Sequence, residues 1–202
     1  MRTSRTVRML AACGVAALVT SATEVRAQAL GPQRQFIAIE PYYARLELDA
    51  GKDVSRVSLY GYGARLWINL APFSGPSPNV VGKGAIALFA TYTPDQNDEG
   101  FTTLHYGAQH DVFFVNRPLG GFIDPLLSVA AGAFRTKAVD IDETETKFAL
   151  TPGLGIRIPV ANRLQIRADA RDIIVFGSRT GAGGEKRTSN SYEFTGALGI
   201  TF

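Results

Sequence analysis

The last twelve residues, Ser191 to Phe202, constrain the fold more than any other part of the chain. They read SYEFTGALGITF, so apolar residues alternate with small or polar ones almost without interruption. Successive side chains of a β-strand point to opposite faces, which gives this segment one apolar and one polar face. A strand of this kind with a terminal aromatic residue is typical of a transmembrane β-barrel, whose outer face meets hydrocarbon.

The amino end has the pattern of a secretory signal peptide. Three arginines, the last of them Arg8, precede an uncharged run over 9–19, and Ala27-Gln28-Ala29 places small residues around a cleavage point. The run is too short to cross a bilayer as a helix, which needs ~20 apolar residues. We therefore expect a cleaved leader over 1–29 and a single mature domain over 30–202.

The single cysteine, Cys13, falls inside this expected leader. Leu10-Ala11-Ala12-Cys13 resembles a lipoprotein box, but Arg8 stands so close to Cys13 that almost no apolar segment precedes the cut. Ordinary cleavage near Ala29 is therefore the favoured interpretation. The mature protein then uses no disulfides, although the compartment it enters permits them.

The excess of basic over acidic residues in the chain comes from the expected leader. The sequence has 21 Lys and Arg against 18 Asp and Glu, and four of the former and one of the latter precede the expected cut, which leaves 17 of each. A neutral mature chain without a basic stripe gives no support to nucleic-acid binding.

Strand-like segments separated by Gly, Pro, Asn and Asp clusters follow one another through the mature chain. Each is long enough for a tilted transmembrane strand, which needs ~9–11 residues. Soluble strands are usually shorter, at ~5–6 residues. The eight segments are 35–48, 56–70, 82–93, 101–115, 125–138, 146–159, 163–176 and 191–202.

An even number of antiparallel strands returns the last strand to the side of the first. Closure matters in lipid, because every unpaired backbone group at an open edge costs several kcal/mol. The sequence therefore predicts an all-β fold, a closed eight-stranded antiparallel up-and-down transmembrane β-barrel. With the amino end on the periplasmic side, the expected outer loops are 49–55, 94–100, 139–145 and 177–190, and the inner turns are 71–81, 116–124 and 160–162.

The mostly polar face of these strands would become the lumen. The interior of an eight-stranded barrel is just wide enough for side chains to fill, and an unpaired charge there is very costly. We therefore expect a salt-bridge network of mixed sign, made by Arg45, Glu47, Arg65, His105, Asp111, Arg157, Arg167, Asp169, Arg171 and Glu193. Trp67 shares this parity and either plugs the lower mouth or marks a register shift.

The eight-strand pattern, the segment RADARD over 167–172 and the terminal YEFTGALGITF resemble the OmpA/OmpX-type outer-membrane barrel superfamily. The resemblance covers essentially the whole mature chain as a pattern, without a tight motif. It implies an integral protein of the bacterial outer membrane, in contact with outer-membrane lipid and lipopolysaccharide. It also implies that the outer-membrane assembly machinery reads the terminal strand, through Tyr192, Phe194, Leu198, Ile200 and Phe202. A peptidoglycan-binding domain is not expected.

Some barrels of this size modify lipid A, which requires a nucleophile beside a base. The two histidines, His105 and His110, lack the His-x-Ser arrangement of a barrel-type lipid A deacylase, although Ser128 remains a conceivable partner of His105. No second His or Cys stands at metal-ligand spacing. We expect no enzymatic activity, no metal and no cofactor.

The sequence favours a monomeric, structural component of the Gram-negative envelope whose exposed loops bind surfaces or ligands. A narrow porin-like pore for small solutes is the main alternative, and a lipid-modifying barrel enzyme is a further one. A soluble periplasmic β-sandwich or lipocalin-like binder is the fourth possibility, since its solvent face would carry the same charges.

Overall fold

The computed structural model describes residues 37–49, 56–69, 81–95, 100–114, 123–139, 143–161, 163–178 and 187–202. The expected leader over 1–29, including Cys13, and most residues of the expected loops and turns lie outside these ranges. The domain boundary near residue 30 therefore stays a prediction.

All of the described regular structure is β-strand, with the predicted number and order of strands. Six of the eight strands match the predicted segments to within two residues at both ends, whereas β6 starts three residues earlier and β8 four residues earlier than expected. The strands are β1 (Ile37–Leu48), β2 (Val57–Asn69), β3 (Val81–Thr93), β4 (Phe101–Phe114), β5 (Asp124–Ala138), β6 (Glu143–Ala161), β7 (Leu164–Ser178) and β8 (Arg187–Thr201).

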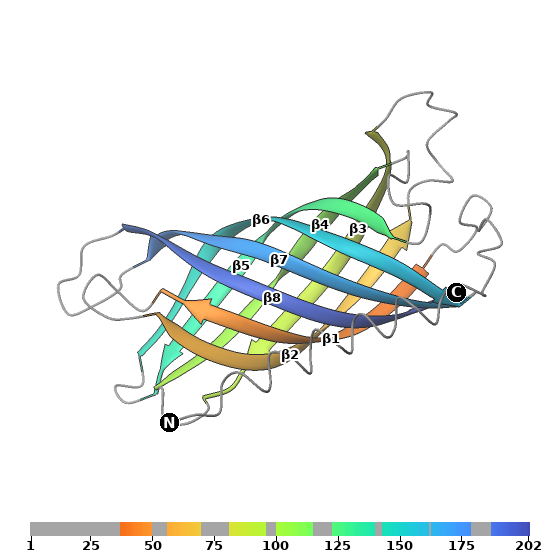
Figure 1. The fold of residues 1–202 in the computed structure, drawn as a ribbon. Helices are drawn as coiled ribbons and strands as arrows, with labels where there is room; N and C mark the ends of the chain where they lie inside the picture. The colour runs from red at the N-terminus through yellow and green to blue at the C-terminus, as the bar shows by residue number, and fades with distance from the viewer. Residues whose placement is uncertain are drawn as a thin grey trace, which may run out of the picture. The chain divides into compact units, whose positions relative to one another are not determined.

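The sheet closes on itself, as the sequence predicted. Each strand pairs antiparallel with the next, and β8 pairs with β1 to complete the barrel (Figure 1). The Phe202 amide donates a hydrogen bond to the Ile37 carbonyl oxygen at 2.9 Å, so pairing extends to the end of the seam. We call the end where β1 begins the terminal end and the opposite end the loop end.

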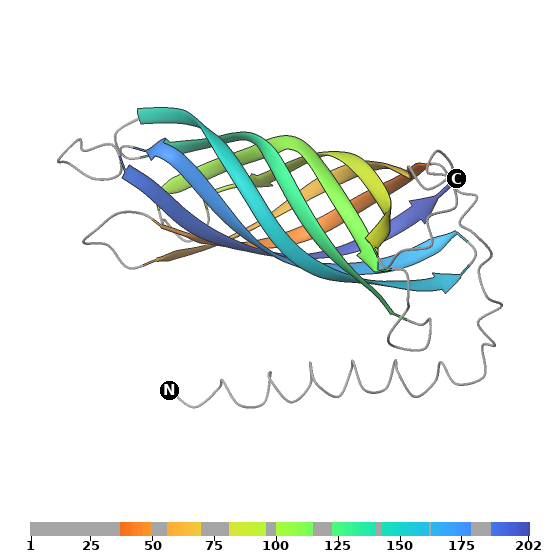
Figure 2. The same cartoon turned by 90° about the horizontal axis from the view of Figure 1, so that it is seen from above.

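The register fixes how strongly the strands tilt. Direct backbone partners lead once around the wall from Leu164 and return to the same strand at Ile174, ten residues further along. The partners on the way are Ile200, Ile39, Leu66, Leu88, Ala108, Ala131 and Leu150. With ordinary strand spacing and rise, this shear gives a tilt of about 40° and a wall about 16 Å across. Figure 2 shows the tilt.

Apolar side chains cover the outside of the barrel. Leu164, Ile166, Leu198 and Ile200 are 40 to 51% exposed, and their strand neighbours on the other parity are buried. The outward residues from Tyr192 on β8 to Phe202, directly after β8, span about 25 Å along the axis at this tilt. That height matches the apolar band of outer-membrane barrels, which is about 25 Å tall between two aromatic girdles.

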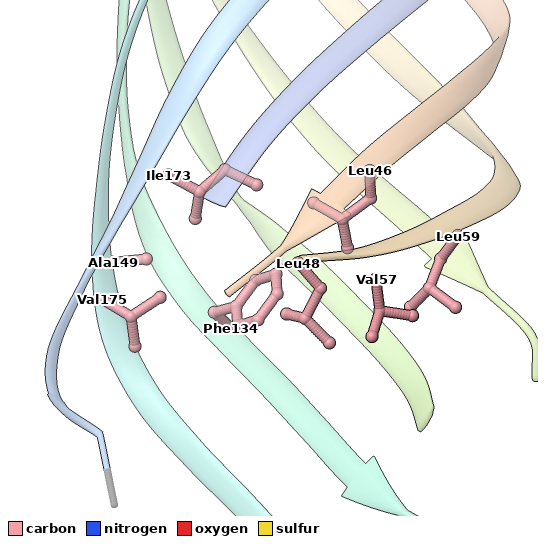
Figure 3. Close-up of a cluster of buried hydrophobic side chains, with 8 residues drawn as sticks. All are labelled: Leu46, Leu48, Val57, Leu59, Phe134, Ala149, Ile173 and Val175. Atoms are coloured by element: carbon pink, nitrogen blue, oxygen red, sulfur yellow. The ribbon is translucent and has the colours of Figure 1, made fainter. Parts of the chain in front are cut away.

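The core of the molecule is the filled lumen, which has apolar clusters toward both ends. At the loop end, side chains from β1, β2, β5, β6 and β7 converge inside the wall (Figure 3). These residues are Leu46, Leu48, Val57, Leu59, Phe134, Ala149, Ile173 and Val175. At the terminal end a second cluster contains Ala38, Trp67, Ala85, Ala87, Phe113 and Leu126. We call them the loop-end cap and the terminal cap. Between them lie mainly polar side chains, together with a small cluster of Tyr42, Ala44 and Ala197.

Candidate functional site

The polar lumen is organised by β7. Its sequence places Arg167, Asp169 and Arg171 at every second position, and a strand directs residues at that spacing to the same face. All three side chains point inward and are at most 5% exposed. One strand thus lines the lumen with two cations that flank an anion.

Arg167 makes the densest set of contacts. Its Nη1 donates to Asp111 Oδ2 at 2.6 Å and its Nη2 to Asp111 Oδ1 at 3.2 Å, across the lumen from β7 to β4. Its Nε donates to both oxygens of Asp169, at 2.9 and 3.0 Å. A planar guanidinium suits such forked contacts, and charge-assisted bonds of this kind are among the strongest in proteins.

Arg65 extends the network to β1 and β2. It donates to Glu40 Oε2 at 3.0 Å and to Asp169 Oδ2 at 3.3 Å, and its side chain has no exposed surface. Gln165 donates to the other Glu40 oxygen at 2.6 Å. Asp169 also accepts a hydrogen bond from Thr195 on β8 at 3.1 Å. The carboxylates therefore have several donors each, which offsets the cost of burying them.

Arg171 joins the network to β4 and β8. Its Nη2 lies 2.7 Å from Glu193 Oε2, and its Nη1 donates to the Gln109 side-chain oxygen at 3.1 Å. Gln109 in turn donates to Asp111 Oδ1 at 2.6 Å. The guanidinium carbon also lies 5.3 Å from the centre of the Phe89 ring.

Two inward glycines leave room for large side chains in the lumen. A Cβ at Gly153 would stand 2.7 Å from Arg171 Cγ and 2.9 Å from Ser128 Oγ. A Cβ at Gly63 would overlap the ring of Tyr42. Tyr42 places its hydroxyl 2.7 Å from Thr91 Oγ1, and Arg65 stacks over its ring at 5.3 Å.

His105 lies just below the loop-end cap. Its ring packs edge-on against Phe89 and Phe134, with centroids 4.7 and 5.7 Å apart. Its Nε2 is 3.4 Å from Thr151 Oγ1, and its Nδ1 is 3.9 Å from Glu193 Oε2. The hydroxyl beside His105 is thus Thr151, whereas Ser128 has no hydrogen-bond partner among the described residues.

The terminal cap contains one further ion pair. Arg157 donates to Asp124 Oδ2 at 3.0 Å and stacks over Trp67 and Phe113, with 5.5 and 4.2 Å to the ring centres. Trp67 is 2% exposed, and its ring packs edge-on against Phe113 at 5.9 Å. Of the two interpretations of Trp67, the structure therefore supports the plug and not a shifted register.

The structure corrects two members of the expected network. Arg45 and Glu47 point outward, where Arg45 is 51% exposed and pairs with Glu47. On β1 the inward residues are the even-numbered ones. The expectation was wrong because the usual pattern of an apolar outer face and a polar inner face reverses at the loop end. There Leu46 and Leu48 belong to the interior cap, and the polar residues face outward. The other eight residues of the expected set are all buried in the lumen.

Several inward residues escaped the sequence analysis. Glu40 lies on the face of β1 opposite to Arg45 and Glu47, which the sequence predicted to be inward. A charge in the middle of a transmembrane strand was the signal that this face is the inner one. Asp124 is the first residue of β5 and lies one residue before the predicted segment 125–138. Gln109, Gln165, Thr151 and Thr195 are uncharged, so a search for charge did not select them.

The outward face carries the expected terminal-strand residues and one unexpected histidine. Tyr192, Phe194, Leu198, Ile200 and Phe202 are 42 to 62% exposed on the outside of β8 and the seam. Their role as an assembly signal stays a prediction. His110 is also exposed on the outer face, where its direct strand partners are Ile86 and Val129.

Neither a metal-binding cluster nor a membrane-spanning helix occurs among the described residues. They contain no group of three or more His, Cys, Asp or Glu side chains arranged to hold a metal ion. No helix among them is long and apolar enough to cross a membrane.

The chain resembles known proteins in its fold. No protein-family model and no curated protein matches the chain. Among solved structures, the chain is similar to Neisserial surface protein A with a TM-score of 0.51 and 14% identity, covering 83% of this chain and 96% of the other. It is similar to the N-terminal β-barrel domain of Pseudomonas aeruginosa OprF with a TM-score of 0.51 and 11% identity, covering 82% and 97%. The chain has the eight-stranded barrel fold of the OmpA/OmpX type.

Proposed function

We propose that the protein is a structural, non-conducting β-barrel of the bacterial outer membrane, exported with a cleaved signal peptide and monomeric. The observation that carries the proposal is the layering of the lumen. An ion-paired centre lies between two apolar caps, and the outside offers an apolar band of membrane height. A barrel whose wall is apolar on the outside and lined by ion pairs on the inside has its lowest free energy in a bilayer.

The layering disfavours a pore. Ions that cross a barrel need a continuous polar path, whereas here Leu59, Ile173 and Phe134 fill the loop end, and Trp67 and Leu126 fill the terminal end, each at most 4% exposed. Between the caps, arginine and carboxylate side chains hold one another at 2.6 to 3.3 Å, which leaves their charges neutralised.

An enzymatic role has less support. Thr151, His105 and Glu193 are arranged like a nucleophile, a base and an orienting acid, but 3.9 Å from His105 to Glu193 is too long for the hydrogen bond that such a triad requires. All three side chains lie between the caps with at most 2% exposed surface. A lipid substrate outside the wall has no route to them through the paired strands.

Planar-bilayer recording of the purified, folded protein tests the proposal. Unheated and boiled samples in detergent gels first establish that the barrel is folded, since a folded barrel changes mobility on heating. We expect the shift and no steady conductance. Steady single-channel conductance would favour the narrow pore, and a protein extracted without detergent would favour the soluble binder.

A further inference from the structure

We propose that Gln165 on β7 and Glu40 on β1 form a latch that holds the closing seam of the barrel shut where Pro41 interrupts its backbone pairing. The seam is the contact of β8 with β1, the last and first strands of the described barrel (Figure 1). The inference goes beyond the proposed function and rests on its membrane location, because an interrupted seam is costly only where water cannot fill the gap.

The backbone pairing of the seam has a gap in mid-strand. Direct partners are present at Ile39–Ile200 and again at Tyr42–Ala197, but not at the two positions between these pairs. Pro41 occupies one of these positions, and a proline has no amide proton to donate to the neighbouring strand. The gap therefore follows from the sequence of β1.

The backbone of Pro41 faces the seam and not β2. The Phe202 amide donates to the Ile37 carbonyl oxygen, so the backbone groups of Ile37 point toward β8. Alternate residues of a strand turn their backbone groups to the same side, which directs Pro41 toward β8 as well. Opposite Pro41 in this register stands Leu198, whose carbonyl oxygen receives no donor from β1. Leu198 is 51% exposed on the apolar band, where lipid chains offer no replacement for that donor.

Inside the wall, the latch crosses the seam at the level of this gap. Gln165 is the direct partner of Gly199 on β8, and Glu40 falls opposite Gly199 in the register of the seam. A Cβ at Gly199 would stand 2.6 Å from Gln165 Cγ and 2.7 Å from its Nε2, so the glutamine side chain lies over this glycine. Beyond it, Gln165 Nε2 donates to Glu40 Oε1 at 2.6 Å. Gly199 thus lets a side chain of β7 reach β1.

The latch is anchored on the far side of the seam. The other Glu40 oxygen, Oε2, accepts a hydrogen bond at 3.0 Å from Arg65, its direct partner on β2. Gln165, Glu40 and Arg65 are at most 5% exposed. Hydrogen bonds to a buried carboxylate are stronger than those between neutral groups. One row of side chains therefore spans the barrel from β7 to β2 on the inside, with the seam in its middle.

A second proline provides an internal comparison. Pro152 on β6 coincides with a gap in the pairing with β7, which stops at Leu150–Ile174 and resumes at Gly153–Arg171. Because β6 and β7 are consecutive in the chain, that gap lies within a hairpin, whereas the gap at Pro41 lies in the contact that closes the barrel. The Pro152 gap is thus a similar backbone defect away from the seam.

Two engineered disulfides separate the seam from the rest of the wall. I39C/I200C joins direct partners of β1 and β8 two residues from the seam gap, and L154C/A170C joins direct partners of β6 and β7 two residues from the other gap. Direct partners in an antiparallel sheet have Cα atoms about 4.5–5.5 Å apart, which a disulfide can bridge. All four positions lie on the outward parity of their strands, so the cross-links leave the lumen unchanged.

The measurement is the rate of unfolding in urea, with the protein in lipid vesicles and the heat-dependent gel shift as the assay of folding. Gln165→Leu should unfold roughly tenfold faster than the wild type, because a hydrogen bond to a buried carboxylate is lost. When I39C/I200C is oxidised, that ratio should fall to about one, since the cross-link then holds the seam. It should return on reduction. With L154C/A170C oxidised, the roughly tenfold ratio should remain.

Gln109→Leu is the matched control for the lost hydrogen bond. Gln109 also donates to a buried carboxylate at 2.6 Å, that of Asp111, but both residues belong to β4 and no seam lies between them. Q109L should also unfold faster than the wild type, and the seam disulfide should leave this ratio unchanged. Gly199→Ala, whose Cβ displaces the Gln165 side chain, should behave as Q165L does and carries the test if Q165L does not fold.

Equal responses of Q165L and Q109L to the seam disulfide would overturn the latch. An unfolding rate of Q165L equal to that of the wild type would overturn it as well. A wild-type protein without the heat-dependent gel shift would instead overturn the proposed function, so the two failures are distinguishable.

Discussion

Arg167 on β7 and Asp111 on β4 meet across the lumen at 2.6 Å, although the two strands share no backbone pairing. Closure of the sheet brings them together, since two strands lie between them in one direction around the wall and four in the other. Their ion pair therefore braces the barrel across its diameter, in addition to the hydrogen bonds that run around it.

Replacing Asp111 by Asn should destabilise the barrel by about 3 kcal/mol, because it removes one charge of a buried, hydrogen-bonded pair. The measurement is the free energy of unfolding in urea, with the protein in lipid vesicles. The double variant D111N/R167Q should cost less than the sum of the two single changes, since the pair is lost only once. Arg45→Gln is the control, because an exposed pair contributes at most about 1 kcal/mol. Equal losses in D111N and R45Q would show that the lumen pair is not a brace.

Substitution by alanine should have different effects on stability at two glycines, Gly153 and Gly196. Gly153→Ala forces Arg171 or Ser128 to move, and overpacking of this kind costs about 1–3 kcal/mol. Gly196 faces outward, and a Cβ there meets nothing within 4 Å, so Gly196→Ala should be neutral or slightly stabilising. Urea unfolding of both variants in the same vesicles compares them. A loss in G196A as large as that in G153A would place Gly196 in a packed interior.

Substitution of the two histidines by leucine should change the free energy of unfolding in opposite directions. His110 faces the apolar band, so His110→Leu should stabilise the barrel in a bilayer by an amount on the order of 1 kcal/mol. His105 contacts Thr151, Phe89 and Phe134 inside the lumen, and His105→Leu leaves the Thr151 hydroxyl without its partner at a cost of about 1–2 kcal/mol. Unfolding of each variant in vesicles checks the signs. A destabilised H110L would mean that this ring has a polar partner in the membrane.

Where both faces of a strand differ throughout, the sequence was enough to predict the structure. The alternation in β7 and β8 gave the inward positions of Arg167, Asp169, Arg171 and Glu193 correctly, since each strand has hydrocarbon on one side and the lumen on the other. The strand number and the closure followed from the same pattern.

The first strand shows where this reasoning fails. Both parities of β1 carry polar and apolar residues, with Glu40 and Tyr42 on one and Arg45 and Glu47 on the other. The rule of apolar outside and polar inside holds only within the hydrocarbon band. Beyond this band, the outside of the barrel is polar and the interior is closed by the apolar loop-end cap. A charged residue near a strand end is therefore assigned to the wrong face if the rule is applied to it.

The sequence also did not predict which residues each lumen charge contacts. Which carboxylate meets Arg167 depends on the shear of the barrel, because a change in register between any two strands rotates every cross-lumen contact. A list of inward charges therefore predicted a network, but not that Asp111 and Asp169 share one guanidinium while Glu193 pairs with Arg171.

The chain's single tryptophan, Trp67, allows the most direct test of a wall that is apolar outside and filled within. In vesicles of brominated phosphatidylcholine, bromine quenches only tryptophans that touch lipid chains. The account predicts weak quenching of the wild-type protein, because Trp67 lies in the terminal cap. It predicts strong quenching of the variant L66W/W67F, whose tryptophan would stand on the outer face at the next position. Strong quenching of Trp67 with weak quenching of L66W/W67F would contradict it.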